Sequence, residues 1–227
     1  MNAKLQATAR GALAAIAALT IGTAAQAQVR ITEVSAWGSG NAPYATDWFE
    51  LTNTGSSAIS LTGWTMDDSS NGSAKVALVG IASIAAGESV IFTESAASAS
   101  FLSTWFGANA PAGLQIGTYT GAGVGLSTGG DAVNVFNAGG TLQANVVFGG
   151  SPAGPSFPTF DNAAGLNNAT ISQLSALGVN GAFAAANDAS EIGSPGRVSA
   201  VPEPGSYALL MAGLGVVGFV ARRRKGV

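Results

Sequence analysis

The 227-residue chain contains no cysteine and no histidine, and only 9% of its residues are charged. Without cysteine no disulfide can form, so a folded body must be stabilised by packing and hydrogen bonds alone. Without histidine the chain lacks the usual acid–base group near neutral pH and the commonest metal ligand. These absences disfavour enzymes that use a histidine base and metal centres built on imidazole or thiolate.

Basic residues are scarce between Gln28 and Val201, where three bases stand against eleven acids and give a net charge of −8. The value of −3 for the whole chain hides this imbalance, because the other six bases lie near the two ends. Binding to nucleic acid depends on Lys and Arg that neutralise phosphates. An acidic body of this kind disfavours a nucleic-acid partner.

The first 27 residues have the three parts of a secretory signal peptide. Lys4 and Arg10 precede the uncharged run 11–24, and Ala25-Gln26-Ala27 supplies a small–x–small cleavage site. We therefore expect signal peptidase to recognise Ala25 and Ala27 and to cut after Ala27. An uncleaved anchor helix is the alternative, although the apolar run is short for a membrane span.

Residues 201–227 form a second targeting segment. Its prolines fix φ and push their neighbours towards extended structure, which suits a protease cleft. The uncharged run of 16 residues after them is predicted to be a single transmembrane helix, shorter than the ~20 residues of a comfortable span. The positive-inside rule places the final cations in the cytoplasm and the body outside. The segment runs from Pro202-Glu203-Pro204 through Ser206–Ala221 to Arg222, Arg223, Arg224 and Lys225.

The body, residues 28–200, is predicted to be one all-β domain. Apolar and polar residues alternate in short runs that are separated by Gly, Asn, Ser and Pro, as in a β-sandwich. Strict alternation in the first run places Glu33 on the same face as Val29 and Ile31, and Val34 on the other. The expected strands are Val29–Ala36, Asp47–Asn53, Ile59–Asp67, Val76–Ile81, Glu88–Thr93, Asp131–Phe136, Leu142–Phe148 and Thr170–Leu177.

One short helix is expected among these strands. Phe101, Leu102, Trp105 and Phe106 recur at helical spacing, with Ser98 or Ser100 as the N-cap. This aromatic stripe is interpreted as cover for the sheet rather than as a ligand platform. Asp131–Phe136 and Leu142–Phe148 are expected to form a hairpin around Ala138-Gly139-Gly140. Gly149–Gly165 is expected to be a loop, and Gly193-Ser194-Pro195-Gly196 ends the domain.

Several of these segments, in this order, resemble the lamin-tail domain family. The resemblance implies an immunoglobulin-like β-sandwich that serves as a binding or attachment module and has no fixed active site. The segments that carry it are Ile31–Val34, Asp47–Asn53, Ile59–Thr65, Gly87–Phe92, Asp131–Phe136 and Ser194-Pro195-Gly196.

The C-terminal segment resembles the PEP-CTERM sorting signal of Gram-negative bacteria that make exopolysaccharide. The Pro202-Glu203-Pro204 motif, the apolar stretch and the Arg-rich end are all present. The resemblance implies that an exosortase-type membrane enzyme cuts near the motif and releases or transfers the body. A plain single-pass anchor with an incidental pair of prolines is the alternative.

Two motifs suggest chemistry but lack a necessary part. Gly125–Gly129 has the G-x-S-x-G spacing of a nucleophile elbow, but no histidine exists to activate Ser127. Asp67–Gly72 resembles the first half of a calcium loop, but Leu78 occupies the place of the closing acid. Both segments are interpreted as connections between strands.

Two pairs of residues could form a site if their side chains were exposed. Trp48 and Trp64 could form a carbohydrate platform, although Trp64 fits the core better. Asp47 and Glu50 could act as a general acid and base, but no substrate cleft is evident near them.

We expect an exported, non-enzymatic protein with a structural or adhesive role at the cell surface or in the extracellular matrix. No cofactor or metal is expected. The expected partners are signal peptidase, an exosortase-type protease, the inner membrane as a transient anchor, and exopolysaccharide. Two alternatives remain open, namely a carbohydrate- or calcium-binding module and a metal-dependent hydrolase built on carboxylates alone.

Overall fold

The computed structural model describes residues 29–68, 75–119, 121, 123–197 and 210–215. The main element of the body is a ten-stranded sheet with the strand order β12-β1-β2-β7-β8-β5-β4-β9-β10-β13. Its first half consists of β12 (Phe160–Asp161), β1 (Val29–Ser35), β2 (Trp48–Asn53), β7 (Ser89–Thr93) and β8 (Ile116–Tyr119). Its second half consists of β5 (Val76–Val79), β4 (Thr65–Asp67), β9 (Asp131–Phe136), β10 (Leu142–Phe148) and β13 (Ala169–Ile171).

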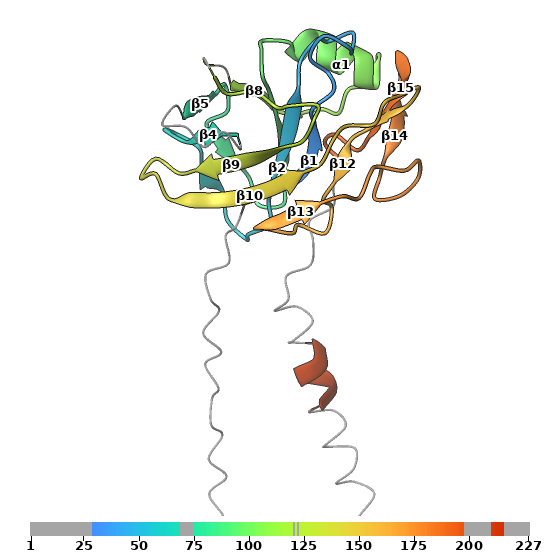
Figure 1. Cartoon of the computed structure of the whole chain (residues 1–227). Helices are drawn as coiled ribbons and strands as arrows, with labels where there is room; N and C mark the ends of the chain where they lie inside the picture. Colours follow the sequence, from blue (N-terminus) through green and yellow to red (C-terminus); the bar gives the residue numbers. More distant parts are fainter. Residues whose placement is uncertain (1–28, 69–74, 120, 122, 198–209, 216–227) are drawn as a thin grey trace, which may run out of the picture.

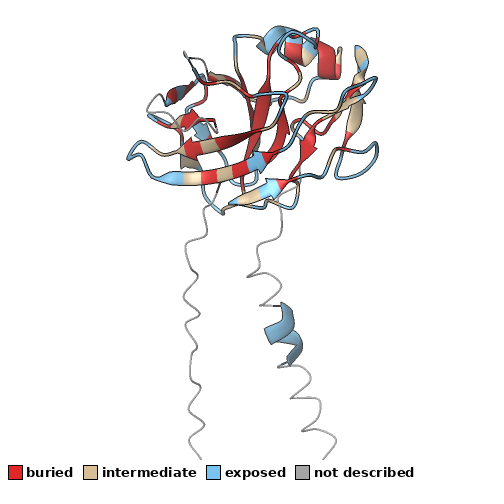
Figure 2. Ribbon diagram, viewed as in Figure 1, coloured by how far each residue is buried: buried red, intermediate tan, exposed pale blue. Residues whose placement is uncertain are grey.

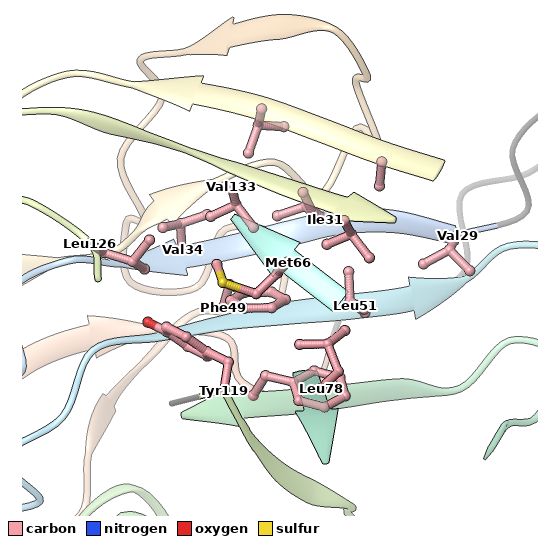
Figure 3. Close-up of a cluster of buried hydrophobic side chains, with 14 of the residues drawn as sticks. Val29, Ile31, Val34, Phe49, Leu51, Met66, Leu78, Tyr119, Leu126 and Val133 are labelled. Atoms are coloured by element: carbon pink, nitrogen blue, oxygen red, sulfur yellow. The ribbon is translucent and has the colours of Figure 1, made fainter. Parts of the chain in front are cut away.

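The two halves of this sheet face each other as a sandwich (Figure 1). β5 joins them, because Leu78 and Val79 pair with β8 whereas Val76 and Ala77 pair with β4. Buried side chains from both halves fill the space between them, among them Ile31, Phe49, Met66 and Val133 (Figure 3). The sequence-based prediction of an all-β sandwich is confirmed.

A second cluster of buried side chains lies on the other face of β2. Every residue of β2 is buried, which Figure 2 shows as a continuous red strand. Phe49 and Leu51 belong to the main core, whereas Trp48 belongs to the second cluster with Phe101 and Trp105 of helix α1 (Ser98–Phe106). The aromatic stripe of the helix therefore covers the sheet, as predicted.

Two small sheets complete the fold. β3 (Ile59–Ser60) pairs with β6 (Ser83–Ile84), and β15 (Asp188–Gly193) lies between β11 (Phe157–Pro158) and β14 (Phe183–Ala185). Phe183 of β14 packs against Trp105 and Phe106 of α1. The second cluster is thus enclosed by α1 and by β14 of the three-stranded sheet β11-β15-β14.

The face assignment that strict alternation gives for β1 is wrong after Ile31. Ile31 pairs with Leu51 and Glu33 pairs with Glu50, so one residue of β1, Thr32, is extra. A bulge of this kind shifts the alternation by one residue. Val29, Ile31 and Val34 consequently face the main core, and Glu33 does not.

The bounds of the short elements also differ from the expected ones. The strand expected at Ile59–Asp67 is divided into β3 and β4 by a turn, in which Trp64 N donates to Leu61 O at 3.0 Å and Gly63 has a φ of 76°. The expected loop Gly149–Gly165 contains β11 and β12, and β14 and β15 were not foreseen. Of the strand expected at Thr170–Leu177 only β13 and a bridge from Phe160 to Leu174 form.

The local predictions around the helix and the hairpin have different outcomes. α1 begins at Ser98, and its N-cap is Ala97 without a side-chain hydrogen bond, so a serine N-cap is wrong. The β9–β10 hairpin is confirmed, and Gly140 N donates to Asn137 O at 2.8 Å in its turn.

Most of the two expected targeting segments lies outside the described residues. Residues 210–215 are helical and exposed. Among the described residues, no helix has the length and apolar character needed to cross a membrane.

Candidate functional site

Two fully buried glutamates lie opposite each other on neighbouring strands at the centre of the body. Glu33 of β1 pairs directly with Glu50 of β2, and both side chains are 0% exposed. Side chains in direct cross-strand pairs have Cβ atoms roughly 4.5–5.5 Å apart. The bulge at Thr32 is what brings the two carboxyls to the same face.

Glu33 is held by residues that are distant in the sequence. Its Oε1 accepts hydrogen bonds from Thr159 Oγ1 at 2.5 Å and from Ser194 N at 2.7 Å. Its Oε2 accepts a longer one, 3.2 Å, from Ser194 Oγ. Thr159 Oγ1 also lies 2.7 Å from Ser175 Oγ. Glu33 thus joins β1 to the segment that follows β15.

Glu50 contacts the same segment two residues further along. Its Oε2 accepts a hydrogen bond from Gly196 N at 2.6 Å, and its Oε1 accepts one from Thr32 Oγ1, also at 2.6 Å. Thr32 Oγ1 in turn lies 2.8 Å from Thr52 Oγ1. The hydrogen-bond donors to both glutamates are therefore hydroxyl and backbone N–H groups, all of them neutral.

We call residues 193–197 the closing segment, because the described body ends with them. A Cβ on Gly193 would lie 2.5 Å from Glu33 Oε1, so only glycine lets the backbone approach so closely. Gly196 has a φ of 69°, which favours glycine. Arg197 N donates to Ser194 O at 2.9 Å, and the Arg197 guanidinium lies 3.9 Å over the Phe183 ring. These contacts give the segment one defined path.

The surroundings favour the protonated form of both glutamates. Burial, with a smaller contribution from the Glu50 charge, raises the pKa of Glu33 to about 8, although hydrogen bonds from Thr159 and Ser194 oppose the rise. Burial also raises the pKa of Glu50 to about 7, against hydrogen bonds from Thr32 and Gly196. Desolvation penalises a charged carboxylate more than neutral donors compensate for it. Because the two groups interact, their protons belong to the pair.

A third buried carboxyl, that of Glu191, forms a hydrogen bond to a residue of the second cluster. Tyr44 Oη donates to Glu191 Oε2 of β15 at 2.9 Å and accepts a hydrogen bond from Trp48 Nε1 at 3.3 Å. Burial raises the pKa of Glu191 to about 7, although the hydrogen bond from Tyr44 opposes the rise. The Tyr44 hydroxyl is thus the hydrogen-bond partner of the buried Trp48 indole N–H.

The structure brings together a pair that sequence reasoning missed. That reasoning weighed Asp47 with Glu50, whereas Glu50 lies against Glu33, and Asp47 Oδ1 accepts a hydrogen bond from Ser39 N at 2.8 Å. The available signal was one acid in each of two strands, Glu33 in Val29–Ser35 and Glu50 in Trp48–Asn53. Only the bulge, which the alternation does not reveal, places them face to face.

The two tryptophans that could have formed a carbohydrate platform are both buried, and Trp64 lies in the core as predicted. Trp48 is 0% exposed and Trp64 is 7% exposed, so neither presents a ring face to solvent. A glycan that stacks on an aromatic ring needs an open face, and both rings are instead packed in the two clusters. This finding removes the basis for a carbohydrate module that uses Trp48.

The G-x-S-x-G segment is a loop. Ser127 is exposed, its Oγ accepts a hydrogen bond from Gly129 N at 3.2 Å, and Ser127 N donates to Asp131 Oδ2 at 2.9 Å. The serine is thus occupied with local turn contacts, which agrees with its interpretation as a connection.

The calcium-like motif is only partly described. Asp67 Oδ1 accepts a hydrogen bond from Asn134 Nδ2 at 2.7 Å, and Asp68 Oδ2 accepts one from Gly125 N at 3.1 Å. Residues 69–74, which include the remainder of the motif, lie outside the described part of the chain. Within that part, no three acidic side chains are close enough to hold a metal ion.

A hollow of about 310 Å³ borders the closing segment and is lined by Glu88, Leu114 and Gly196 among others. The acidic residue in its lining, Glu88, accepts hydrogen bonds from Gln115 Nε2 to Oε1 at 2.8 Å and from Ala85 N to Oε2 at 2.6 Å. The Glu88 carboxylate therefore has hydrogen-bond partners within the fold.

All residues expected to direct targeting lie outside the described part of the chain. They are Ala25, Ala27, Pro202, Glu203, Pro204, Arg222, Arg223, Arg224 and Lys225.

Comparison with protein families shows the family to which most of the body belongs. The model of the Lamin Tail Domain matches residues 22–150, more than half of the chain. The chain belongs to the lamin tail domain family. The immunoglobulin-like sandwich that the family implies agrees with the observed fold. The matched part of the lamin tail domain ends before β11, and the later strands β12 and β13 extend its sheet at both edges.

A second family model, the PEP-CTERM protein-sorting motif, matches residues 200–225. This motif implies a secreted protein that an exosortase-type enzyme sorts. No curated protein matches the chain. The sorting motif begins three residues after Arg197, so the closing segment is the last described part of the body before the sorting signal.

Proposed function

We propose that the chain is a non-enzymatic surface or matrix protein, in which the lamin tail domain is the exported part and the C-terminal segment is its sorting signal. The observation that carries this proposal is the PEP-CTERM match at 200–225, directly after the folded body. The proposed domain organisation is a signal peptide at 1–27, a body at 28–200 and a sorting signal at 201–227.

The sorting step is proposed to occur at Pro202-Glu203-Pro204. Two prolines in three residues keep the chain extended, which is the shape that a protease cleft accepts. Arg222, Arg223, Arg224 and Lys225 would hold the end of the chain on the cytoplasmic side, so the motif would lie near the outer surface of the inner membrane. Signal peptidase would already have removed residues 1–27 after Ala27.

The body is proposed to act as a structural or adhesive component, with exopolysaccharide as a candidate partner. Its acids support this role more than a catalytic one, because Glu33 and Glu50 are both 0% exposed and a substrate cannot reach them. Their hydrogen bonds go to the closing segment, which is a structural use of two carboxyls.

Replacement of Glu203 by Ala in the native strain tests the sorting step. Cell fractionation should find the Glu203→Ala protein in the inner membrane rather than in the surface or matrix fraction, because the altered motif is not processed. Val201→Ala, a neighbouring change outside Pro202-Glu203-Pro204, is the matched control and should fractionate like the wild type. Equal surface amounts of the Glu203→Ala protein and the control would contradict the proposal.

A further inference from the structure

The closing segment is attached to the centre of the body through two carboxyls that have neutral donors. Ser194 N donates to Glu33, and Gly196 N donates to Glu50. Both acceptors are 0% exposed and lie opposite each other on β1 and β2. Two carboxylates this close in a medium of low dielectric repel each other, so the closed arrangement favours a state that holds a proton.

We propose that the Glu33–Glu50 pair is a proton-dependent latch, which holds the closing segment while the pair retains a proton and releases it when both carboxyls are ionised. This inference depends on the fold alone and is independent of the proposed sorting step.

Glu33 can keep both of its short hydrogen bonds when it binds one proton. In Glu33 both short hydrogen bonds end on Oε1, so Oε2 can carry the proton. The Ser194 hydroxyl, 3.2 Å from Oε2, can rotate and accept it. Ionisation of both carboxyls removes this arrangement and leaves two buried charges side by side.

The charged groups on the segments around the pair come from five places. Asp161 lies opposite Glu33 on β12, Glu191 lies on β15, Arg30 lies on β1, Arg197 ends the closing segment, and Glu88 lines the hollow beside Gly196. Asp161 accepts hydrogen bonds from Ala163 N and Asn180 Nδ2, each at 2.8 Å. The neighbouring elements β7, β11, β14 and α1 carry no charged side chain.

The direction of the pH effect follows from the two states. In the closed state burial raises the pKa of Glu33 to about 8, whereas in the open state the carboxyl would be solvated and near its ordinary value of about 4.5. The closed state therefore binds the proton more tightly and weakens as pH rises from about 5 to about 8, with up to roughly tenfold more opening per pH unit for each titrating group. Above this range the opening should level off.

Release would lengthen the tether between the body and the sorting motif. With the latch closed, the described body ends at Arg197, and four residues of the sequence separate Arg197 from Pro202. Freeing residues 193–197 would add five residues, or at most about 18 Å of extended chain. The latch thus controls how far the motif can extend from the folded body.

Hydrogen exchange of the Ser194 and Gly196 amides in the full chain tests the latch, because these amides donate to the two carboxyls. After correction for the intrinsic exchange rate at each pH, their protection should fall at least tenfold between pH 6 and pH 9. The Leu51 and Val133 amides in the sheet should remain more strongly protected than the closing segment at every pH, although the stability of the whole body also falls as pH rises. The result expected from a local latch is therefore a gap in protection, with the closing segment always the less protected site.

The double variant Glu33→Gln and Glu50→Gln supplies the comparison. Each Gln keeps an oxygen acceptor for the backbone N–H, and its amide can donate to Ser194 Oγ or Thr32 Oγ1 after these hydroxyls rotate. Protection of the closing segment should then be independent of pH. Glu88→Gln, which changes an acid outside the latch, should behave like the wild type.

Three outcomes would overturn the proposal. They are wild-type protection of Ser194 and Gly196 that does not change with pH, a loss that the double Gln variant shows equally, and protection at Leu51 and Val133 that equals that of the closing segment at every pH, which would mean that all these amides exchange by global unfolding. If the double variant does not fold, the wild-type comparison between the closing segment and the sheet still decides.

Discussion

Tyr44 and Glu191, which are 147 residues apart in the sequence, are joined by a buried hydrogen bond of 2.9 Å between Tyr44 Oη and Glu191 Oε2. The same hydroxyl accepts a hydrogen bond from Trp48 Nε1. One phenol therefore joins the loop before β2 to β15 and satisfies the indole between them. This contact stabilises the second cluster, on the face of β2 away from the main core.

Tyr44→Phe should destabilise the body by about 1–3 kcal/mol, because it leaves a buried carboxyl and a buried indole N–H without their partner. Urea denaturation of the full chain, followed by tryptophan fluorescence, measures this loss in the free energy of unfolding.

Tyr119→Phe is the matched control for that change. The Tyr119 hydroxyl is also buried, but no described residue forms a hydrogen bond with it. Its removal should leave the free energy of unfolding unchanged or raise it by up to about 1 kcal/mol, because an unsatisfied polar group is lost. Equal destabilisation by both variants would contradict the role assigned to the Tyr44–Glu191 contact.

Gly193→Ala should destabilise the body by about 1–3 kcal/mol, because the added methyl group overpacks a filled site. Its Cβ would lie 2.5 Å from Glu33 Oε1 and 2.9 Å from the Trp105 ring. Thermal denaturation of the full chain measures the shift. Gly149→Ala is the control, since nothing lies within 4 Å of its Cβ, and it should change little. A neutral Gly193→Ala variant would show that the closing segment does not pack closely on Glu33.

The body should be more stable at pH 5 than at pH 8. Burial raises the pKa of Glu33 to about 8 and the pKa values of Glu50, Glu191 and Asp47 to about 7. A carboxyl with a raised pKa in the folded state stabilises that state fully below its ordinary pKa and progressively less as pH rises through the folded value. The expected loss between pH 5 and pH 8 from Glu33 alone is about 3 kcal/mol, and the other three carboxyls change the stability in the same direction.

Urea midpoints at the two pH values measure this loss. Glu33→Gln should reduce the difference between them, because the variant has no proton to lose at this position. A body that is more stable at pH 8 than at pH 5 would be incompatible with two buried carboxyls that have only neutral donors.

The sequence predicts the sandwich and its helix well, because the alternation in Trp48–Asn53 and the spacing of Phe101 and Trp105 are local signals. It does not predict the face of Glu33, because the single extra residue Thr32 reverses the alternation without any glycine or proline to mark it. The burial of both faces of β2 was also hidden. It depends on α1 and the small sheet, which contact β2 only in the folded state.

The closing segment shows the same limit. Gly193-Ser194-Pro195-Gly196 is recognisable as an end signal, but its role depends on two acids more than 140 residues earlier in the chain. β14 and β15 were missed because Phe183–Ala185 is short and Asp188–Gly193 is polar, so neither shows a clear alternation. Tertiary contacts rather than local propensity determine these strands.

The most direct test of the central claim is the intact mass of the protein isolated from the surface or matrix of the native organism. The account predicts a chain that begins at Gln28 and ends near Pro202-Glu203-Pro204, without Arg222, Arg223, Arg224 and Lys225. A mature protein that retains residues 1–27 or the four C-terminal cations would contradict it.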